Sequence, residues 1–191
     1  MRLILTTAAN EEPVTLNDAR THLRISDDDR TEDALILGII SAARIEAERT
    51  LGRPLVSQSW TAKMDGFPDS DEIELPLPPL VSVTTVKYVD PDGELQTFSS
   101  AYYTVDTSGV CGRIYLNYGY SWPDIRLEPN AVRIEFVAGY GDASAVPEDV
   151  RAWMLLRIGD RYEHREGIVV GTIASSLPEL GGMLLGDRVG F

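Results

Sequence analysis

Residues 31–64 read TEDALILGIISAARIEAERTLGRPLVSQSWTAKM, and this stretch decides the fold class. In its first part, residues 31–51, apolar side chains recur at the spacing of an amphipathic helix. Gly52, with Pro54 two residues later, is a strong helix stop. After the stop the apolar period changes towards two, and residues 58–64 are typical of a strand. The stretch therefore predicts a long helix that leads directly into a β-rich region.

The long helix is predicted to have one buried and one wetter side. Arg44, Glu48 and Arg49 lie on the wetter side of the pattern. The apolar residues at helical spacing are predicted to face the core: Leu35, Ile36, Ile39, Ile40, Ala43 and Ala47.

A shorter helix is predicted before it. Thr15 is a good N-cap and Asp18 sits at the capping-box position, so this helix begins near Thr15 and ends around residues 24–25. Ser26 or one of the three aspartates at 27–29 is then expected to cap the long helix.

The middle of the chain is predicted to be mainly antiparallel β-structure. Asp90-Pro91-Asp92-Gly93 has good turn chemistry and joins two strands into a hairpin. Residues 75–80 are expected to form an extended connector, because three of the six are prolines. The predicted strands are 58–64, 71–75, 81–89, 94–98, 102–105, 113–116 and 131–137.

Helical character returns at Pro147, where Glu148 and Asp149 lie at the positive end of the predicted helix. This helix is expected to end at about His164 or Glu166. Its run from Trp153 to Leu156, followed by Ile158, is apolar nearly all round. The run is either the core of a single subunit or a face that packs against a neighbouring subunit.

The C-terminal segment from Gly167 to Phe191 has six glycines and no strong period. It is too apolar for a solvated tail. Either it orders on docking to a partner, or it packs on its own subunit. Its apolar residues include Ile168, Val169, Val170, Ile173, Leu177, Met183, Leu184 and Leu185.

Composition limits the possible functions. The chain has 191 residues, 17 basic and 30 acidic, for a formal net charge of −13. Such a surface repels phosphate, so binding of nucleic acid through a basic footprint is not expected. The charge either serves solubility alone or has a functional role. Cys111 is the only cysteine, which rules out an intramolecular disulfide. No signal peptide or transmembrane helix is predicted, so synthesis in the cytoplasm without membrane association is expected.

No constellation of residues indicates catalysis. His22 and His164 are predicted to be surface residues, and the aspartates at 27–29 lack the glycine and distal glutamate of a calcium loop. The glycines at 139 and 141 are not followed by the Lys-Ser/Thr of a phosphate loop. The aromatic-rich stretch at 115–122 either packs in the β region or supplies binding anchors. No catalytic residue, cofactor or metal site is predicted, and a hydrolase that uses carboxylates of the β region is a remote alternative.

Several landmarks in a fixed order resemble a known family. They are Pro13-Val14-Thr15-Leu16-Asn17-Asp18-Ala19-Arg20-Thr21-His22-Leu23-Arg24, the acidic residues 27–29, Thr50-Leu51-Gly52-Arg53-Pro54-Leu55, Gln58-Ser59-Trp60, Leu75-Pro76-Leu77-Pro78-Pro79-Leu80, Phe136-Val137-Ala138-Gly139-Tyr140-Gly141, and Val146-Pro147 before the last helix. From about residue 10 to the C-terminus, the ordered set resembles the phage head–tail connector family. The resemblance is to its longer members with a β insertion, which also occur in prophages and gene transfer agents.

The resemblance implies a structural role in a virion, at the head–tail interface. Such connectors form a ring, usually twelvefold, beneath the portal protein. The ring extends the DNA channel and provides the platform for the stopper or tail. Genomic DNA would pass through it without sequence-specific binding. A stopper or tail-completion protein of the same particle is the alternative function. The glycines at 181, 182 and 186 depart from the family's final helix.

The sequence thus predicts an α+β fold in which both chain ends build a helical connector core, residues 1–54 and 142–191. The inserted β domain is residues 55–141. The residues predicted to contact a neighbouring subunit or the portal are Arg44, Glu48, Arg49, Arg157, Arg161, Ile168, Val170, Ile173, Leu184 and Leu185.

Overall fold

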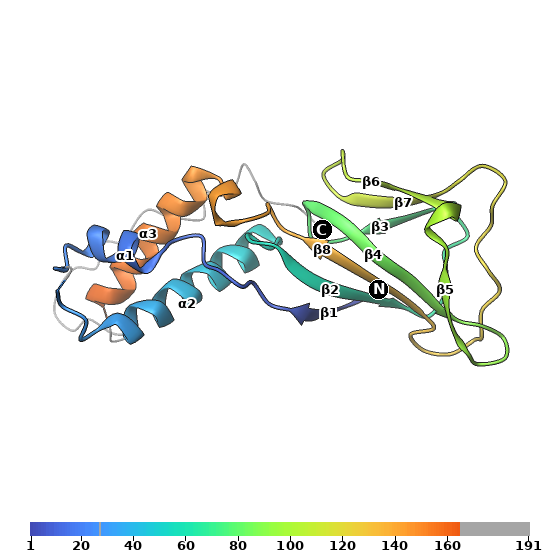
Figure 1. The fold of residues 1–191 in the computed structure, drawn as a ribbon, viewed down its shortest axis with the longest axis horizontal. Coiled ribbons are helices and arrows are strands. Elements are labelled where there is room, and N and C mark those ends of the chain that lie inside the picture. Colours follow the sequence, from blue (N-terminus) through green and yellow to red (C-terminus); the bar gives the residue numbers. More distant parts are fainter. Residues whose placement is uncertain (27, 165–191) are drawn as a thin grey trace, which may run out of the picture. The chain divides into compact units, whose positions relative to one another are not determined.

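The computed structural model describes residues 1–26 and 28–164 and divides the chain into two compact units. The sheet unit combines Met1–Ala9 with Val56–Gly141, and the helical unit combines Asn10–Leu55 with the residues from Asp142 onward. Figure 1 shows the helices and the strands as separate groups. The α+β fold predicted from the sequence is confirmed. Residues 1–9 lie in the sheet unit, whereas the predicted division placed them with the helices.

The helical unit contains three helices: α1 (Leu16–Leu23), α2 (Asp33–Leu51) and α3 (Glu148–Glu163). A short 3₁₀ helix, η2 (Ala143–Ala145), precedes α3. All three helices pack against one another. Their contact surfaces are formed by apolar side chains that are essentially inaccessible to solvent: Ile36, Ile40, Ala43, Ala47, Leu51, Val150, Met154 and Ile158.

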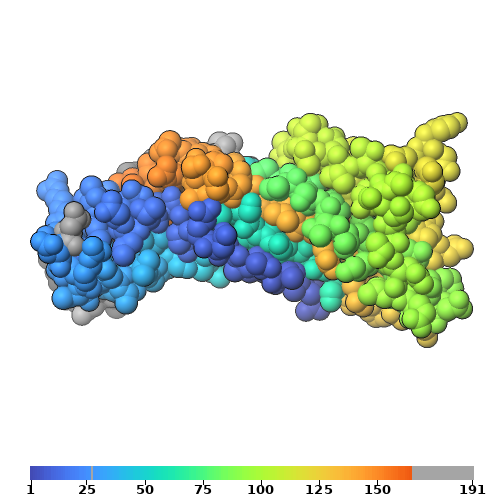
Figure 2. Space-filling view, viewed as in Figure 1, coloured from blue at the N-terminus to red at the C-terminus, as the bar shows by residue number. Residues whose placement is uncertain are grey.

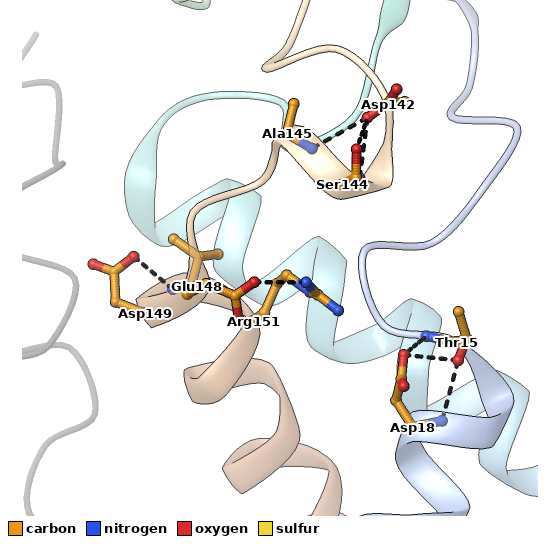
Figure 3. A network of polar contacts seen from close by, with 9 residues as sticks. Thr15, Asp18, Asp142, Ser144, Ala145, Glu148, Asp149 and Arg151 are labelled. Atoms are coloured by element: carbon orange, nitrogen blue, oxygen red, sulfur yellow. Dashed lines mark hydrogen bonds and ion pairs between the residues drawn. The ribbon is translucent and has the colours of Figure 1, made fainter.

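The predicted capping box of α1 is present in full. The backbone N–H of Asp18 donates to Thr15 Oγ1 at 3.1 Å, and the backbone N–H of Thr15 donates to Asp18 Oδ2 at 3.0 Å (Figure 3). The hydroxyl of Thr15 also donates to Asp18 Oδ2 at 2.7 Å, and this bond, together with the one from the Thr15 backbone N–H, lowers the pKa of Asp18. At the other end, Arg24 adopts a left-handed conformation with φ 58° and ends the helix.

The predicted cap of α2 was wrong. The N-cap residue is Glu32, and it makes no capping hydrogen bond with its side chain. Asp29 instead accepts hydrogen bonds from the backbone N–H and the hydroxyl of Thr31, at 3.0 and 2.6 Å. The aspartate therefore stabilises the turn before the helix rather than the helix end. The predicted stop at Gly52 is confirmed, with φ 69° and a hydrogen bond to the Glu48 carbonyl.

The sheet unit consists of two antiparallel sheets. The five-stranded sheet has the order β1 (Arg2–Thr7), β2 (Gln58–Met64), β8 (Val132–Ala138), β4 (Leu80–Val89) and β5 (Leu95–Phe98). The three-stranded sheet has the order β3 (Glu72–Leu75), β7 (Gly112–Leu116) and β6 (Tyr103–Asp106), with the 3₁₀ helix η1 (Ser100–Tyr102) just before β6.

One hydrophobic core is built from both sheets. Ile73 and Ile114 come from the three-stranded sheet, and Val86, Ile134 and Phe136 from the five-stranded sheet. Strand β8 is central and alternates strictly between buried and half-buried residues. Its alternation is the reason that the sequence pattern located it within one residue.

Strand β1 was not predicted. It pairs with β2 in the register Arg2 with Lys63 through Leu5 with Trp60, and a bulge at Thr6 shifts the last pair. Its side chains are exposed or only half-buried, so the short segment has no strict alternation to mark it as a strand. Its hydrogen-bond partners lie more than fifty residues away in the sequence, and only the folded sheet brings them together.

Candidate assembly surfaces of the helical unit

Two of the predicted interface residues, Arg44 and Glu48, bind each other and neighbouring segments of their own unit. Arg44 Nη1 lies 2.9 Å from Glu48 Oε2, and Arg44 Nε lies 2.8 Å from Glu12 Oε2. Glu48 Oε1 also accepts a hydrogen bond from the backbone N–H of Leu55 at 3.1 Å. The network ties the segment before α1 and the segment after α2 to the middle of α2.

The charge of Arg44 is well compensated. Burial of its guanidinium opposes the charged form, but the hydrogen bond to Glu12 and the charge of Glu48 outweigh the burial and raise the pKa of Arg44. The side chain of Arg44 is 11% exposed. The charged group thus stabilises the fold, and little of it is available to a partner.

Arg157 and Arg161 converge on one carboxylate of α2. Arg157 Nε lies 2.9 Å and Arg161 Nη2 2.8 Å from Glu46 Oε2. Arg157 also pairs with Asp160 at 2.8 Å. Burial would raise the pKa of Glu46, but the hydrogen bonds from the two arginines outweigh it and lower the pKa. The hydrogen bond with Glu46 raises the pKa of Arg157 in turn.

Arg49 differs from these four residues. It is exposed, and within residues 1–26 and 28–164 it forms no ion pair with another side chain. The five predicted contact residues Ile168, Val170, Ile173, Leu184 and Leu185 lie outside the described residues. Of the predicted interface residues that the structure describes, Arg49 is the one whose charge is most accessible to a partner.

Sequence reasoning missed the structural role of Arg20. Its side chain is only 2% exposed, its Nη2 donates to the carbonyl oxygen of Ser26 at 3.2 Å, and its Nε lies 3.5 Å from Asp33 Oδ1. Arginine side chains are mostly exposed, so Arg20, on the same short helix as the polar residues Thr21 and His22, would ordinarily be predicted to lie on the surface. Here it links α1 to the turn before α2 and to the first residue of α2.

Sequence reasoning also missed that α2 is apolar on a side that the described part of its unit leaves exposed. Leu35 was predicted to be in the core, but it is 40% exposed. Leu37 and Ile45 are 49% and 38% exposed, and Ala34 and Gly38 are exposed as well. The signal was present in the sequence, because apolar or small residues occur all around the helix between Ala34 and Ala43.

The apolar run of α3 is divided between the core and the surface. Trp153, Met154 and Ile158 are buried, whereas Leu156 is 46% exposed. The first turn of α3 carries the expected acids, and Arg151 Nη1 binds Glu148 Oε1 at 2.8 Å (Figure 3). In the space-filling view the first part of α3, in orange, adjoins α1, in blue (Figure 2).

The predicted surface histidines are exposed: His22 on α1 and His164 directly after α3. Within the described ranges, no three His, Cys, Asp or Glu side chains are grouped as metal ligands would be. The described helices also include none that is long and apolar enough to span a bilayer.

The aromatic residues of the sheet unit are partly packed on its core and partly accessible on its surface. Trp122 stacks on Phe67 with ring centroids 4.8 Å apart, and its Nε1–H donates to the Ser70 carbonyl at 2.8 Å. Tyr102 and Tyr120 stack at 4.7 Å on the surface, and the ring of Tyr118 is fully exposed. The tryptophan thus packs on the core, and the tyrosines remain accessible.

Comparisons with known proteins agree with this architecture. Residues 13–105 match the model of the family described as phage gp6-like head–tail connector protein. The matched segment runs from the residues before α1 into β6. This match confirms the resemblance to the head–tail connector family that was drawn from the sequence. The comparison with curated proteins finds no match.

The solved structures that resemble the chain come from gene transfer agent (GTA) particles. A chain in the neck of an empty GTA particle computed with C6 symmetry superposes with a TM-score of 0.79 at 24% identity, covering 100% of this chain and 97% of that chain. A chain of the native GTA virion gives the same values. A chain in the neck of a native GTA particle computed with C12 symmetry gives 0.77 at 23% identity, with the same coverage. The likeness establishes a shared fold.

Proposed function

We propose that the chain is a structural head–tail connector of a tailed phage or a gene transfer agent, and that it assembles beneath the portal protein as a ring, twelvefold as the family resemblance implies. The observation that carries the proposal is the family match over residues 13–105, which includes both α1 and α2. The shared fold with chains of GTA necks supports the same location, the head–tail interface of the virion.

The accessible surfaces support assembly rather than catalysis. Four of the predicted contact residues are engaged within the helical unit: Arg157 and Arg161 join α3 to α2, and Arg44 and Glu48 hold the segments before α1 and after α2. The uncovered apolar side of α2 is a surface that a soluble single subunit would ordinarily avoid. A ring of such subunits would bury that surface in each copy.

The charge of the chain suits a DNA channel. The sheet unit, residues 1–9 and 56–141, contains 6 basic and 12 acidic residues, and therefore contributes −6 to the net charge of −13. A channel wall of the same sign as DNA disfavours adhesion and allows the genome to slide. In this proposal the DNA passes through the ring without sequence-specific contacts. The side of the ring that faces away from the portal receives the stopper or tail-completion protein.

The test is to mix the purified chain with portal rings encoded in the same genome and to weigh the product by native mass spectrometry. The proposal expects a discrete complex with about one copy of the chain per portal subunit or another fixed ratio. Absence of binding to intact portal rings, together with binding to isolated tails, would instead support a stopper or tail-completion role.

A further inference from the structure

Helix α2 has a second apolar face that residues 1–26 and 28–164 of its own subunit do not cover. We define the α2 face as the residues on the side opposite the buried core: Ala34, Leu35, Leu37, Gly38, Ser41, Ala42, Ile45 and Arg49. Arg49 is the only charged residue among these eight, and the two glutamates at its edges, Glu46 and Glu48, are paired with arginines of the same unit. The other side of the helix packs into the core through Ile36, Ile40 and Ala43. A helix that is apolar on both sides is expected to be covered on both sides.

The shape of the α2 face permits a close approach of another helix. A Cβ atom built on Gly38 would meet nothing within 4 Å. Ser41 and Ala42 are also small, so the middle of the face is shallow between Leu37 and Ile45. Small residues between larger apolar ones allow the ridges of a second helix to enter the groove.

Helix α3 exposes a face of complementary character. We define the α3 face as its exposed residues at helical spacing, which are Asp149, Ala152, Leu156 and Glu163. Leu156 is 46% exposed and Ala152 adds a small apolar surface. The acids lie near the two ends of the face. Arg49 would therefore meet a carboxylate whichever way the two helices run relative to each other.

The two faces cannot meet within one subunit. Helices α2 and α3 pack on each other through their buried sides, from Ile36 and Ile40 on α2 to Met154 and Ile158 on α3. Arg161 of α3 lines a groove together with Ala42, Ile45 and Arg49 of α2, but Arg161 is not one of the α3-face residues, which are exposed. A second copy of the chain can therefore supply the α3 face to the α2 face of the first, and a third copy can continue the series.

We propose that the α2 face of each subunit binds the α3 face of the next subunit, with Arg49 paired to an acid of the neighbour. The contact joins two different surfaces, and a head-to-tail contact of this kind is what a closed ring requires. The inference rests on the proposed ring function and names the surfaces through which the ring forms.

The test uses the photo-crosslinking residue benzoylphenylalanine at Ile45, in the full chain bound to portal rings. The expected product is a ladder of dimers and larger oligomers, and mass spectrometry is expected to locate the crosslinked peptides in residues 148–163 of a second copy. Crosslinks into α2 of a second copy would indicate a two-fold pair, and crosslinks into the portal protein or into the same subunit would indicate another occupant. Each of these three results overturns the inference. The matched control carries the same group at Thr21, an exposed residue of α1, and is expected to give no such ladder.

A charge exchange provides a second, independent readout. Arg49→Glu is expected to weaken ring assembly on the portal by roughly fivefold per contact, because an attractive pair becomes repulsive at the rim of the interface. Adding Asp149→Arg and Glu163→Arg to that variant is expected to restore assembly. If Arg49→Glu alone assembles as well as the original chain, or if the two added substitutions restore nothing, the pairing of Arg49 is wrong.

The two proposals fail in distinguishable ways. Native mass spectrometry of the unmodified chain with portal rings first establishes whether a stoichiometric complex forms. A complex without crosslinks from Ile45 to the α3 face would refute the contact and leave the connector function standing. Absence of any complex would refute both.

Discussion

Substitutions of Gly38 are expected to affect the stability of the isolated protein and the assembly of the ring in opposite directions. It lies in the interior of α2, where glycine is about 0.5–1 kcal/mol less favourable than alanine. Because a Cβ atom at this position meets nothing within 4 Å, Gly38→Ala adds helix propensity without steric cost. The isolated protein is therefore expected to gain about 0.5–1 kcal/mol of unfolding free energy, which is up to about a fivefold change in the folding equilibrium. Gly38→Leu is expected to stabilise the isolated protein by a similar amount, because leucine is nearly as good a helix former.

Assembly is expected to respond in the opposite direction. In a close helix–helix contact, the additional side chain of Gly38→Leu would overpack the interface at a cost of about 1–3 kcal/mol per contact. Portal-bound copies are then expected to fall at least about fivefold at limiting protein concentration. Urea unfolding followed by fluorescence measures the first quantity, and native mass spectrometry with portal rings measures the second. Gly38→Leu with normal stability and undiminished assembly would refute the argument, and a destabilised Gly38→Ala would show that the position is covered within the subunit.

Three further predictions concern the fold itself. Glu46→Gln should lower the unfolding free energy at pH 7. The difference in unfolding free energy between the variant and the original chain should shrink as the pH falls below about 4.5. The reason is that the pKa of Glu46 is lowered in the folded state, so that protonation of Glu46 removes its stabilisation. A difference that stays the same from pH 7 to pH 3 would contradict this. Gly139→Ala should destabilise the protein by more than about 2 kcal/mol in a thermal melt, because φ is 131° and a Cβ atom would lie 2.5 Å from the Val56 carbonyl oxygen. The control Gly119→Ala, with φ 85° and free space around the new Cβ atom, should cost about 1 kcal/mol. Equal costs for the two variants would show that the close contact at Gly139 is unimportant. Thr15→Ala should cost about 0.5–2 kcal/mol in urea unfolding through loss of the α1 cap, and an unchanged midpoint would refute the cap's contribution.

The features predicted correctly from the sequence are those that local chemistry determines. Thr15 and Asp18 form their capping box because both partners lie within one helical turn. Gly52 ends α2 because glycine adopts positive φ without a steric penalty. The central strand β8 was located because its alternation reflects burial on one face of the sheet.

The features that were missed depend on partners distant in the sequence. Strand β1 is held by β2 across more than fifty residues. The burial of Arg20 depends on its contacts with the turn before α2 and with Asp33, the first residue of α2. Leu35 was assigned to the core because periodicity identifies apolar faces but not which of two apolar faces the subunit itself covers. Arg44 and Glu48 were predicted to lie on the wetter side of α2, whereas each is half-buried in an ion-pair network. Helical periodicity does not reveal this network, because Glu12, a partner of Arg44, lies outside the helix.

The central claim is that the chain forms the ring between portal and tail. Its most direct test is a cryo-electron microscopy reconstruction of the particle neck, made with particles whose copy of this chain carries a small visible fusion. The account predicts a ring of this chain in contact with the portal, with the α2 face of each subunit against the α3 face of the next. A fusion density on the tail side of another ring, or no density in the neck, would contradict it.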